Sequence, residues 1–226
     1  MLALLYDVHG NLPALDAVVA DAEGAGADRY LLGGDYALFG AWPAETVERL
    51  RALDATWIRG NVDRWTADPD DAPEAVRRAI AVCRELLGDE GVEELARLPE
   101  QLVLDRVRYC HASPHSDVDG FAVDDPERDA ELLAGAAEER VVFGHTHLQF
   151  ERRSPAGPML LNPGSVGMPL DGDRRAAYAL MREEGGDVEL RRVDYDWQAS
   201  ARAARERLGD AGEVPARRIE QARFDA

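Results

Sequence analysis

Aspartate, asparagine and histidine side chains recur along this chain of 226 residues in short polar motifs, each placed directly after an apolar run. The residues concerned are Asp7, His9, Asp35, Asn61, His111, His145 and His147. Carboxylate and amide oxygens suit hard divalent cations, and imidazole suits transition metals. Two such cations held about 3.5–4 Å apart can share a carboxylate and a water, lower the pKa of that water and draw charge from a phosphate group. The sequence therefore predicts a site for a pair of divalent metal ions.

Each motif taken alone also has a structural interpretation. The Asp7–His9 motif is short and unspecific, and Asp35, which follows two glycines, could cap a turn. The pair His145 and His147 could be a surface feature. The ordered combination is stronger than its parts, because four of the chain's five histidines directly follow apolar runs. We therefore favour the metal interpretation over an all-structural one.

The apolar runs that precede the motifs predict the strands of a parallel sheet. Residues 2–6, 30–32 and 56–58 are short apolar runs that each end at a polar motif. Between them, apolar residues recur at helical spacing in two segments that begin near Pro13 and Pro43. This alternation is typical of a parallel sheet covered by helices, in which ligands bind outside the carboxyl ends of the strands. The motifs are thus expected to meet at one edge of the sheet.

The remaining chain predicts more helices and a second sheet. Helices are expected at residues 64–99, 127–136 and 198–208, and strands at 102–104, 107–110 and 140–143. Four more short strands, separated by turns with Gly or Pro, are expected at 149–153, 159–161, 177–181 and 188–193. We expect these last four to run antiparallel and form the second sheet. The chain has no repeat or linker, so a single domain over residues 1–226 is predicted, with helix 198–208 as a candidate lid or dimer element.

Composition limits the classes of partner. The formal net charge is −18, and all 26 basic residues are arginine, so an extended nucleic-acid surface is not expected. A small phosphate substrate held by metals remains compatible with this charge. No apolar run is long enough to span a membrane, and the apolar N-terminus has no basic leader. The two cysteines, Cys83 and Cys110, form no CxxC motif, so we expect reduced thiols in a cytoplasmic protein.

Five sequence blocks resemble the calcineurin-like metallophosphoesterases and follow the order of that family. They are DVHGN (7–11), GGD (33–35), GNVD (60–63), YCHASP (109–114) and GHTH (144–147). NPGS (162–165) further resembles the small prokaryotic phosphodiesterase branch. The resemblance implies an α/β fold of four layers, in which two mixed β-sheets pack face to face and are flanked by helices.

The resemblance also implies how the ligands divide between the two metals. One cation would be held by Asp7, His9, Asp35 and His147, and the other by Asp35, Asn61, His111 and His145. Asp35 would bridge the two, and Asn61 would bind through its amide oxygen. The metals implied are Mn²⁺, Fe, Zn²⁺ or Ni²⁺, among which mixed nitrogen and oxygen ligands do not choose.

The implied activity is hydrolysis of a small phosphodiester or phosphomonoester by attack of a metal-bridging hydroxide. A dinucleoside polyphosphate hydrolase stays open as an alternative. A protein phosphatase of the same superfamily is less favoured, because residues 34–40 read GDYALFG where such enzymes read GDxVDRG. A non-catalytic metal-binding scaffold is disfavoured, because every ligand histidine is present. Assembly into a homo-oligomer is left open.

One departure from the family concerns the leaving group. Many members carry a histidine where this chain has Val62, and valine can neither stabilise the transition state nor donate a proton. The candidate replacement is His115, with an exposed loop histidine as the alternative. With Asp35, Asn61 and His111 it completes the predicted catalytic set.

Three other polar residues have candidate roles near the predicted metals. Asn11 and Arg64 are candidate substrate-binding residues, with helix capping and a surface role as their respective alternatives. Asp63 could orient a ligand histidine or stabilise its own turn.

Overall fold

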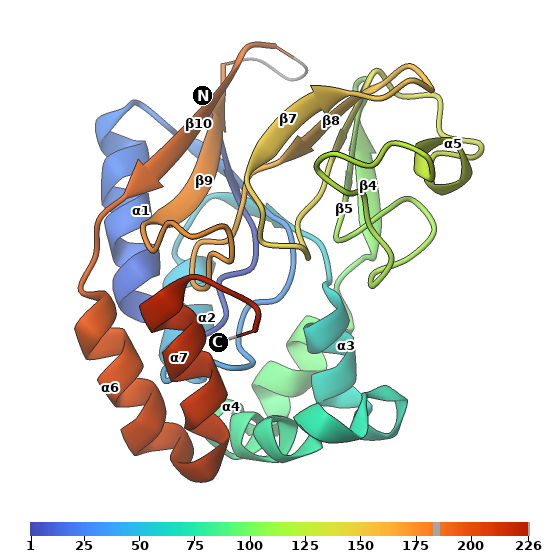
Figure 1. The fold of residues 1–226 in the computed structure, drawn as a ribbon. Helices are drawn as coiled ribbons and strands as arrows, with labels where there is room; N and C mark the ends of the chain where they lie inside the picture. The colour runs from blue at the N-terminus through green and yellow to red at the C-terminus, as the bar shows by residue number, and fades with distance from the viewer. Residues whose placement is uncertain (183–185, 226) are drawn as a thin grey trace.

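Two five-stranded sheets packed face to face form the centre of the computed structural model, which describes residues 1–182 and 186–225 (Figure 1). The first sheet has the order β10 (Val188–Val193), β9 (Ala176–Met181), β1 (Leu2–Leu5), β2 (Arg29–Leu32) and β3 (Ala55–Trp57). The second has the order β4 (Gln101–Leu104), β5 (Val107–Cys110), β6 (Arg140–Val142), β8 (Met159–Asn162) and β7 (Phe150–Arg153). Both sheets are mixed, with three parallel strands in each. The predicted fold class is confirmed.

Strand β1 shows how the sequence builds these layers. Successive side chains of a strand point to opposite faces of its sheet. Leu2 and Leu4 therefore face the second sheet, where they share a core with residues such as Tyr109. Ala3 and Leu5 face the helices on the other side. A strand buried on both faces reads as a continuous apolar run, which is why this one could be recognised from sequence.

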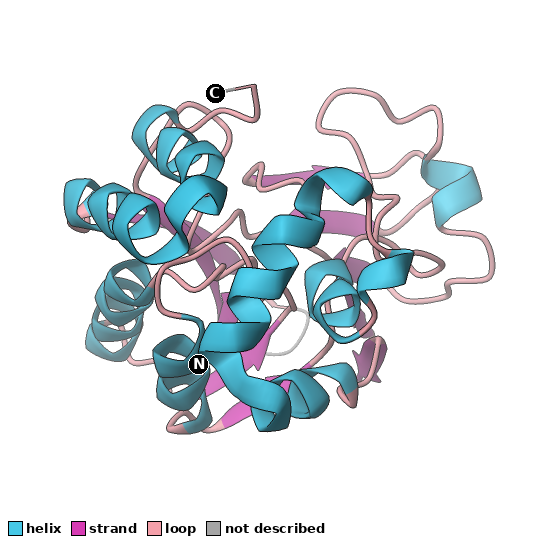
Figure 2. Ribbon diagram, turned by 90° about the horizontal axis from the view of Figure 1, so that it is seen from below, coloured by secondary structure: helices cyan, strands magenta, loops and turns pink. Residues whose placement is uncertain are grey.

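Helices cover the outer face of the first sheet and one end of the molecule, as Figures 1 and 2 show. They are α1 (Leu12–Gly24), α2 (Pro43–Arg51), α3 (Asn61–Ala67) and α4 (Arg77–Ala96), with the short 3₁₀ turns η1 (Pro69–Asp71) and η2 (Glu74–Val76) before α4. The outer face of the second sheet is covered by loops and by the short helix α5 (Asp129–Leu132). The predicted helix 127–136 is therefore much shorter than expected. Gly135, at φ 77°, turns the chain away after Leu132 and Leu133 pack on the sheet and Asp129 pairs with Arg152 of β7.

The sheet assignment of the last two strands was wrong. We expected all four late strands in the second sheet, but β9 and β10 join the first, where β9 runs antiparallel to β1. Every residue of β9 is buried, so this strand needs a neighbour on both sides and a covering layer on both faces. Between β1 and β10, β9 has a paired strand on each side, with the helices packed on one face and the second sheet on the other. In the second sheet, β6 and β8 are parallel and only β7 pairs antiparallel, at the edge.

The C-terminal segment forms two paired helices, α6 (Trp197–Leu208) and α7 (Glu213–Gln221), joined by η3 (Gly209–Gly212). The narrow apolar stripe of α6, which includes Ala204 and Leu208, packs against Ile219 of α7 and Leu86 of α4. The stripe is thus used within the chain, and a lid or dimer role for α6 stays a prediction. Helix α7 was not expected from the sequence.

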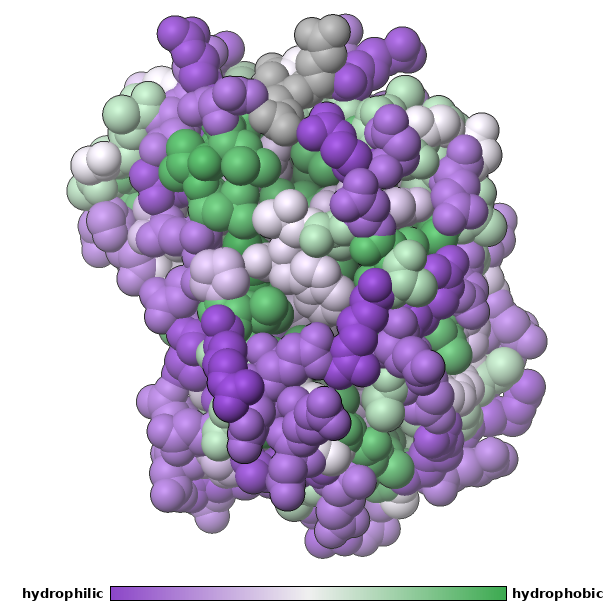
Figure 3. Space-filling view, turned by 180° about the vertical axis from the view of Figure 1, so that it is seen from behind, coloured by the Kyte–Doolittle hydropathy of each residue, from purple (hydrophilic) through white to green (hydrophobic). Residues whose placement is uncertain are grey.

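The surface of the protein is mostly hydrophilic, with apolar side chains in separate patches on the face drawn in Figure 3. Within the described residues, no helix combines the length and the apolar character needed to cross a membrane.

Candidate metal centre

Five of the seven predicted ligands have backbone φ angles in the left-handed region. The angles are 55° at Asp7, 47° at His9, 60° at Asp35, 64° at His145 and 60° at His147. A residue other than glycine pays roughly 1 kcal/mol or more for this conformation, and such residues gather at functional sites. The structure holds them in place through backbone hydrogen bonds, for example from the His9 amide to the carbonyl of Asp35 at 2.9 Å. The strain is therefore concentrated where the predicted ligands converge.

Two glycines allow the strand-end loops to approach closely. A Cβ atom at Gly34 would lie 2.5 Å from the backbone nitrogen of Gly60 and 2.8 Å from His111 Nδ1. A Cβ atom at Gly60 would lie 2.1 Å from a carboxylate oxygen of Asp35. Only glycine fits at these contacts, so the GGD and GNVD motifs bring Asp35, Asn61 and His111 together as much by their glycines as by their polar residues.

His9, His147 and Asp7 form the first cluster of candidate ligands, and all three are buried. The Nε2 atoms of the two histidines lie 3.1 Å apart, and His147 Nε2 lies 3.5 Å from Asp7 Oδ1. His9 Nε2 also lies 3.8 Å from Asp35 Oδ2. Four atoms that could bind a metal, from loops far apart in the sequence, thus face one small space.

The hydrogen bonds of these histidines fix where their lone pairs point. His9 Nδ1 donates to the carbonyl of Leu38 at 2.9 Å, and His147 Nδ1 donates to the carbonyl of Met168 at 2.6 Å, since a carbonyl can only accept. In the neutral rings both Nε2 lone pairs therefore face each other, which is repulsive without a cation between them. Burial lowers the pKa of His9 and lowers that of His147 well below its usual range. Neutral imidazoles oriented by backbone carbonyls are what metal ligation requires.

The second cluster gathers around Asp35 and His111. His111 Nε2 lies 3.3 Å from Asp35 Oδ2 and 3.8 Å from Asp7 Oδ1, while His111 Nδ1 bonds the carbonyl of Gly33. The end of the Asn61 amide that faces the site lies 3.0 Å from His111 Nε2 and 2.9 Å from His145 Nδ1. With the amide oxygen in that position, this space is rich in acceptors, and a cation satisfies it. The donor chemistry of both clusters therefore fits divalent metals.

Five of the seven predicted ligands fall into two overlapping groups, and the other two, Asn61 and His145, lie beside His111. Asp7, His9 and His147 form one group, and Asp7, Asp35 and His111 form the other. Asp7 thus takes part in both groups. Asp35 Oδ2 faces both His9 and His111, so it lies between the clusters. The bridging role implied for Asp35 stays a prediction.

Charge in the second cluster is concentrated on Asp35 and His111. Burial raises the pKa of Asp35, but the neighbouring His111 outweighs this effect and holds the carboxyl well below its usual range. Burial lowers the pKa of His111, but the Asp35 and Asp7 carboxylates outweigh it and raise that pKa to about 10. Burial also raises the pKa of Asp7 well above its usual range. A cation that binds here replaces protons, because it competes for the same lone pairs.

Asp63 holds the turn that carries Asp35. Its Oδ2 accepts from the backbone amides of Asp35 and Gly60, both at 2.9 Å, and its Oδ1 accepts from that of Tyr36 at 3.1 Å. No histidine is among the partners that the structure gives Asp63 in the described residues. Of its two candidate roles, the structure shows the stabilisation of the turn.

Asn11 is occupied by the protein itself. Its Oδ1 accepts from the Ala14 amide at the start of α1 and from Ser200 Oγ at 2.8 Å, and its Nδ2 donates to the carbonyl of Gly167 at 2.7 Å. The side chain is also buried. The structure shows the helix-capping alternative, and a role of Asn11 in substrate binding stays a prediction.

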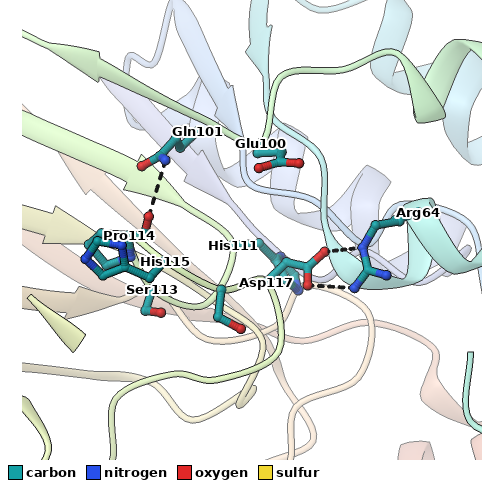
Figure 4. A pocket seen from close by; sticks show the side chains of 9 residues that line it. Arg64, Glu100, Gln101, His111, Ser113, Pro114, His115 and Asp117 are labelled. Atoms are coloured by element: carbon teal, nitrogen blue, oxygen red, sulfur yellow. Dashed lines mark hydrogen bonds and ion pairs between the residues drawn. The ribbon is translucent and has the colours of Figure 1, made fainter. Parts of the chain in front are cut away.

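Arg64 and His115 line a polar cavity of about 260 Å³ beside His111, which Figure 4 shows. Arg64 makes two hydrogen bonds of 2.7 Å to Asp117 and also pairs with Asp71, so two carboxylates already neutralise it. His115 is exposed, and its Nε2 bonds the carbonyl of Ala134 at 2.6 Å. The structure does not turn either side chain to the ligand clusters, and their roles in substrate binding and proton donation stay predictions.

A second cavity, of about 430 Å³, opens on the clusters beside His9 and His147. Its other walls are mostly apolar and include Val62, Trp65 and Phe224, with one cation, Arg218. Sequence reasoning missed Arg218 and Phe224. No motif marks them; Arg218 lies in the last turn of α7, and Phe224 follows three residues after the helix ends at Gln221.

The comparisons with known proteins agree with this site. The model of the calcineurin-like phosphoesterase superfamily domain matches residues 1–186, and the chain belongs to this superfamily. It is 30% identical over 219 residues to the uncharacterized protein MJ0912 of Methanocaldococcus jannaschii, covering 87% of this chain and 88% of the relative. The crystal structure of a metallophosphoesterase from Sphaerobacter thermophilus superposes with a TM-score of 0.84 at 27% identity, covering 98% of both chains. The hypothetical protein PH1004 of Pyrococcus horikoshii shares the fold, with a TM-score of 0.80 at 23% identity and coverage of 94% and 96%.

Proposed function

We propose that this protein is a metal-dependent phosphoesterase that hydrolyses a small phosphodiester or phosphomonoester. The observation that carries the proposal is the convergence of the buried His9, His147 and His111 on two shared carboxylates, Asp7 and Asp35. The Nε2 atoms of His9 and His147 face each other at 3.1 Å, an arrangement that a cation between them would stabilise. Membership in a phosphoesterase superfamily supports a phosphate ester as the substrate class.

The metals would be held in two groups that share carboxylates. Asp7, His9, Asp35 and His147 would hold one, and Asp35, Asn61, His111 and His145 would hold the other, a division that the contacts above support. Divalent ions such as Mn²⁺, Fe, Zn²⁺ or Ni²⁺ would activate water and neutralise charge on the phosphate. The chain's own contribution is orientation: the carbonyls of Leu38 and Met168 keep two imidazoles neutral and aimed at the site.

The surroundings of Val62 favour esters with good leaving groups. Its amide donates to Asp35 Oδ1 at 3.0 Å, and its side chain lines the apolar cavity, where it can donate no proton. His115 is bonded to a backbone carbonyl instead of facing the clusters. We infer that leaving groups that need little protonation, such as phenolates, react best.

Metal-dependent turnover of two aryl esters tests the proposal. Protein stripped with a chelator should not hydrolyse bis(p-nitrophenyl) phosphate or p-nitrophenyl phosphate, and Mn²⁺, Fe²⁺, Zn²⁺ or Ni²⁺ should restore turnover. Metal analysis of the reloaded protein should give two equivalents for each chain. Binding of metal without turnover of any ester would indicate the scaffold alternative. Neither binding nor turnover would overturn the proposal altogether.

A further inference from the structure

The cavity beside His9 and His147 differs from an ordinary solvent-filled cleft because its walls are mainly apolar. Phe39, Val62, Trp65, Met168, Leu170 and Phe224 face it, and the ligands His9 and Asp35 lie in its wall. At about 430 Å³ it falls in the size range of roughly 300–1,000 Å³ that small-ligand sites occupy. Anything bound in it meets the candidate metals at one end and apolar side chains elsewhere.

Arg218 of α7 places a positive charge in this apolar wall. It is half-buried, and burial lowers its pKa. Its Nε donates to the carbonyl of Phe224 at 3.3 Å, and its guanidinium stacks on the Phe224 ring, 4.3 Å from the centroid. Within residues 1–182 and 186–225, no carboxylate lies within ion-pair distance of it. Its charge also acts on His9, whose pKa it helps to lower.

A half-buried cation without a carboxylate partner costs free energy, so its position calls for an anion that the described residues do not supply. Phosphate oxygens match the planar guanidinium in geometry, and their attraction is stronger among apolar walls than in water. A net charge of −18 would otherwise repel a phosphate ester, which makes a local cation more valuable. Arg218 also lies beyond residue 186, where the match to the family domain ends, so the C-terminal helices add it to the site.

We propose that Arg218 binds a non-bridging oxygen of the substrate phosphate, and that the apolar walls around Trp65 and Phe224 take an aromatic substituent of the ester. The proposal rests on the proposed function and narrows it to phosphate esters that carry an aromatic group. Arg218 would bind substrate from the wall of the same cavity that contains His9, Asp35 and His147. Val62 provides no charge to contact the phosphate, so in this proposal the positive charge comes from Arg218 of α7.

Binding of inorganic phosphate to the metal-loaded protein tests the role of Arg218 directly. By isothermal titration calorimetry, Arg218→Ala should weaken phosphate binding about 10- to 100-fold, since a hydrogen bond to a charged group is lost. Arg218→Lys should recover part of the loss. Arg217→Ala is the matched control, because Arg217 lies on the same helix but is exposed and pairs with Glu213, and it should bind phosphate like the wild type.

Two diesters with the same leaving group test the apolar walls. Phe224→Ala changes a side chain that is 70% exposed and should leave folding intact. It should lower kcat/KM for bis(p-nitrophenyl) phosphate about 5-fold through a higher KM, and leave methyl p-nitrophenyl phosphate nearly unchanged, because only the first ester carries a second ring. Equal losses on both esters would overturn this part of the proposal.

The results separate this inference from the proposed function. Wild-type turnover with unchanged phosphate affinity in Arg218→Ala would overturn the inference and leave the phosphoesterase proposal standing. Loss of phosphate binding in Arg218→Ala, with metal content and melting temperature as in the wild type, supports the inference even if no ester is turned over. If Arg218→Ala and Phe224→Ala gave the same loss on both esters and no change in phosphate binding, Arg218 would only support the C-terminal segment.

Discussion

Two cavities flank the ligand clusters, and each contains one arginine. The charge of one arginine is neutralised by carboxylates, and that of the other is not, within the described residues. The polar cavity of about 260 Å³ contains Arg64, whose charge is taken up by Asp117 and Asp71. The apolar cavity of about 430 Å³ contains Arg218, which has no such carboxylate partner in the described part of the chain. A neutralised cation in a polar wall adds little attraction for phosphate, whereas a free cation in an apolar wall adds much more. This difference is the basis of our proposal that substrate approaches from the apolar side.

The residues around the two cavities come from two parts of the chain. The ligands come from loops that follow strands within the family domain, and their positions are fixed by backbone strain and close glycine contacts. The free cation comes from α7, which packs through Ala216 and Ile219 on the rest of the chain. In the proposed function, the metal chemistry and the choice of substrate therefore come from different parts of the sequence, and substitutions can test them separately.

The largest effect is expected at Asp35, which faces both ligand clusters. Asp35→Asn removes the carboxylate that faces His9 and His111, so both metals should bind less well. We expect kcat/KM to fall more than about 100-fold, because even changes around a metal ligand cost about 10- to 100-fold. Asp16→Asn, at an exposed carboxylate paired with Arg49, is the control and should retain wild-type activity and metal content. A fully active Asp35→Asn protein would contradict the shared-centre geometry.

The second effect is a dependence of metal affinity on pH, which should arise at the ligand clusters. The pKa of His111 is raised to about 10, above its ordinary value near 6.5, so below pH 10 a metal must displace its proton. Between pH 6.5 and 10, metal affinity should therefore rise about tenfold for each pH unit, because one proton is displaced. Calorimetry in buffers of different ionisation enthalpy counts the released protons. A flat affinity across that window would show that His111 is neutral before the metal binds.

A smaller effect is expected at the neutralised cation of the polar cavity. Arg64→Ala should change phosphate affinity less than about 3-fold, far less than Arg218→Ala, because Asp117 and Asp71 already balance the charge. It should reduce the free energy of unfolding by roughly 0.5–1 kcal/mol, since the ion pair is partly exposed. Phosphate titration and urea unfolding measure the two quantities. If Arg64→Ala weakened phosphate binding as much as Arg218→Ala, the contrast between the cavities would be lost.

The sequence was sufficient to predict that the candidate ligands converge, because their signals are local. A buried strand followed by Asp7 or Asp35 is visible in a few residues, and parallel strands carry such motifs to one edge. The pairing of β9 with β1 is different, since it is decided by contacts between residues far apart in the chain. Nothing in the local pattern of β9 says which sheet it joins.

Arg218 and Asn11 illustrate the same limit at the level of single residues. Arg218 reaches the apolar cavity only through the packing of α7, and Asn11, which caps α1 through the Ala14 amide, is also bonded to Ser200, 189 positions away. Residue type and spacing predict what chemistry a group can perform. Which partner occupies that group is set by the tertiary fold.

The smallest effect is expected at His115, the candidate proton donor. Its Nε2 is held by the Ala134 carbonyl at 2.6 Å, and the ring lies on the polar side, away from the cavity that we assign to substrate. His115→Ala should therefore leave the pH–rate profile unchanged for both p-nitrophenyl and poorer phenyl leaving groups. The discriminating measurement is the basic limb of kcat/KM with the poorer leaving group, where loss of a proton donor has its largest effect. If that limb shifted only for the poorer leaving group, His115 would reach substrate after all, and the polar cavity would hold the leaving group while Arg218 holds the phosphate.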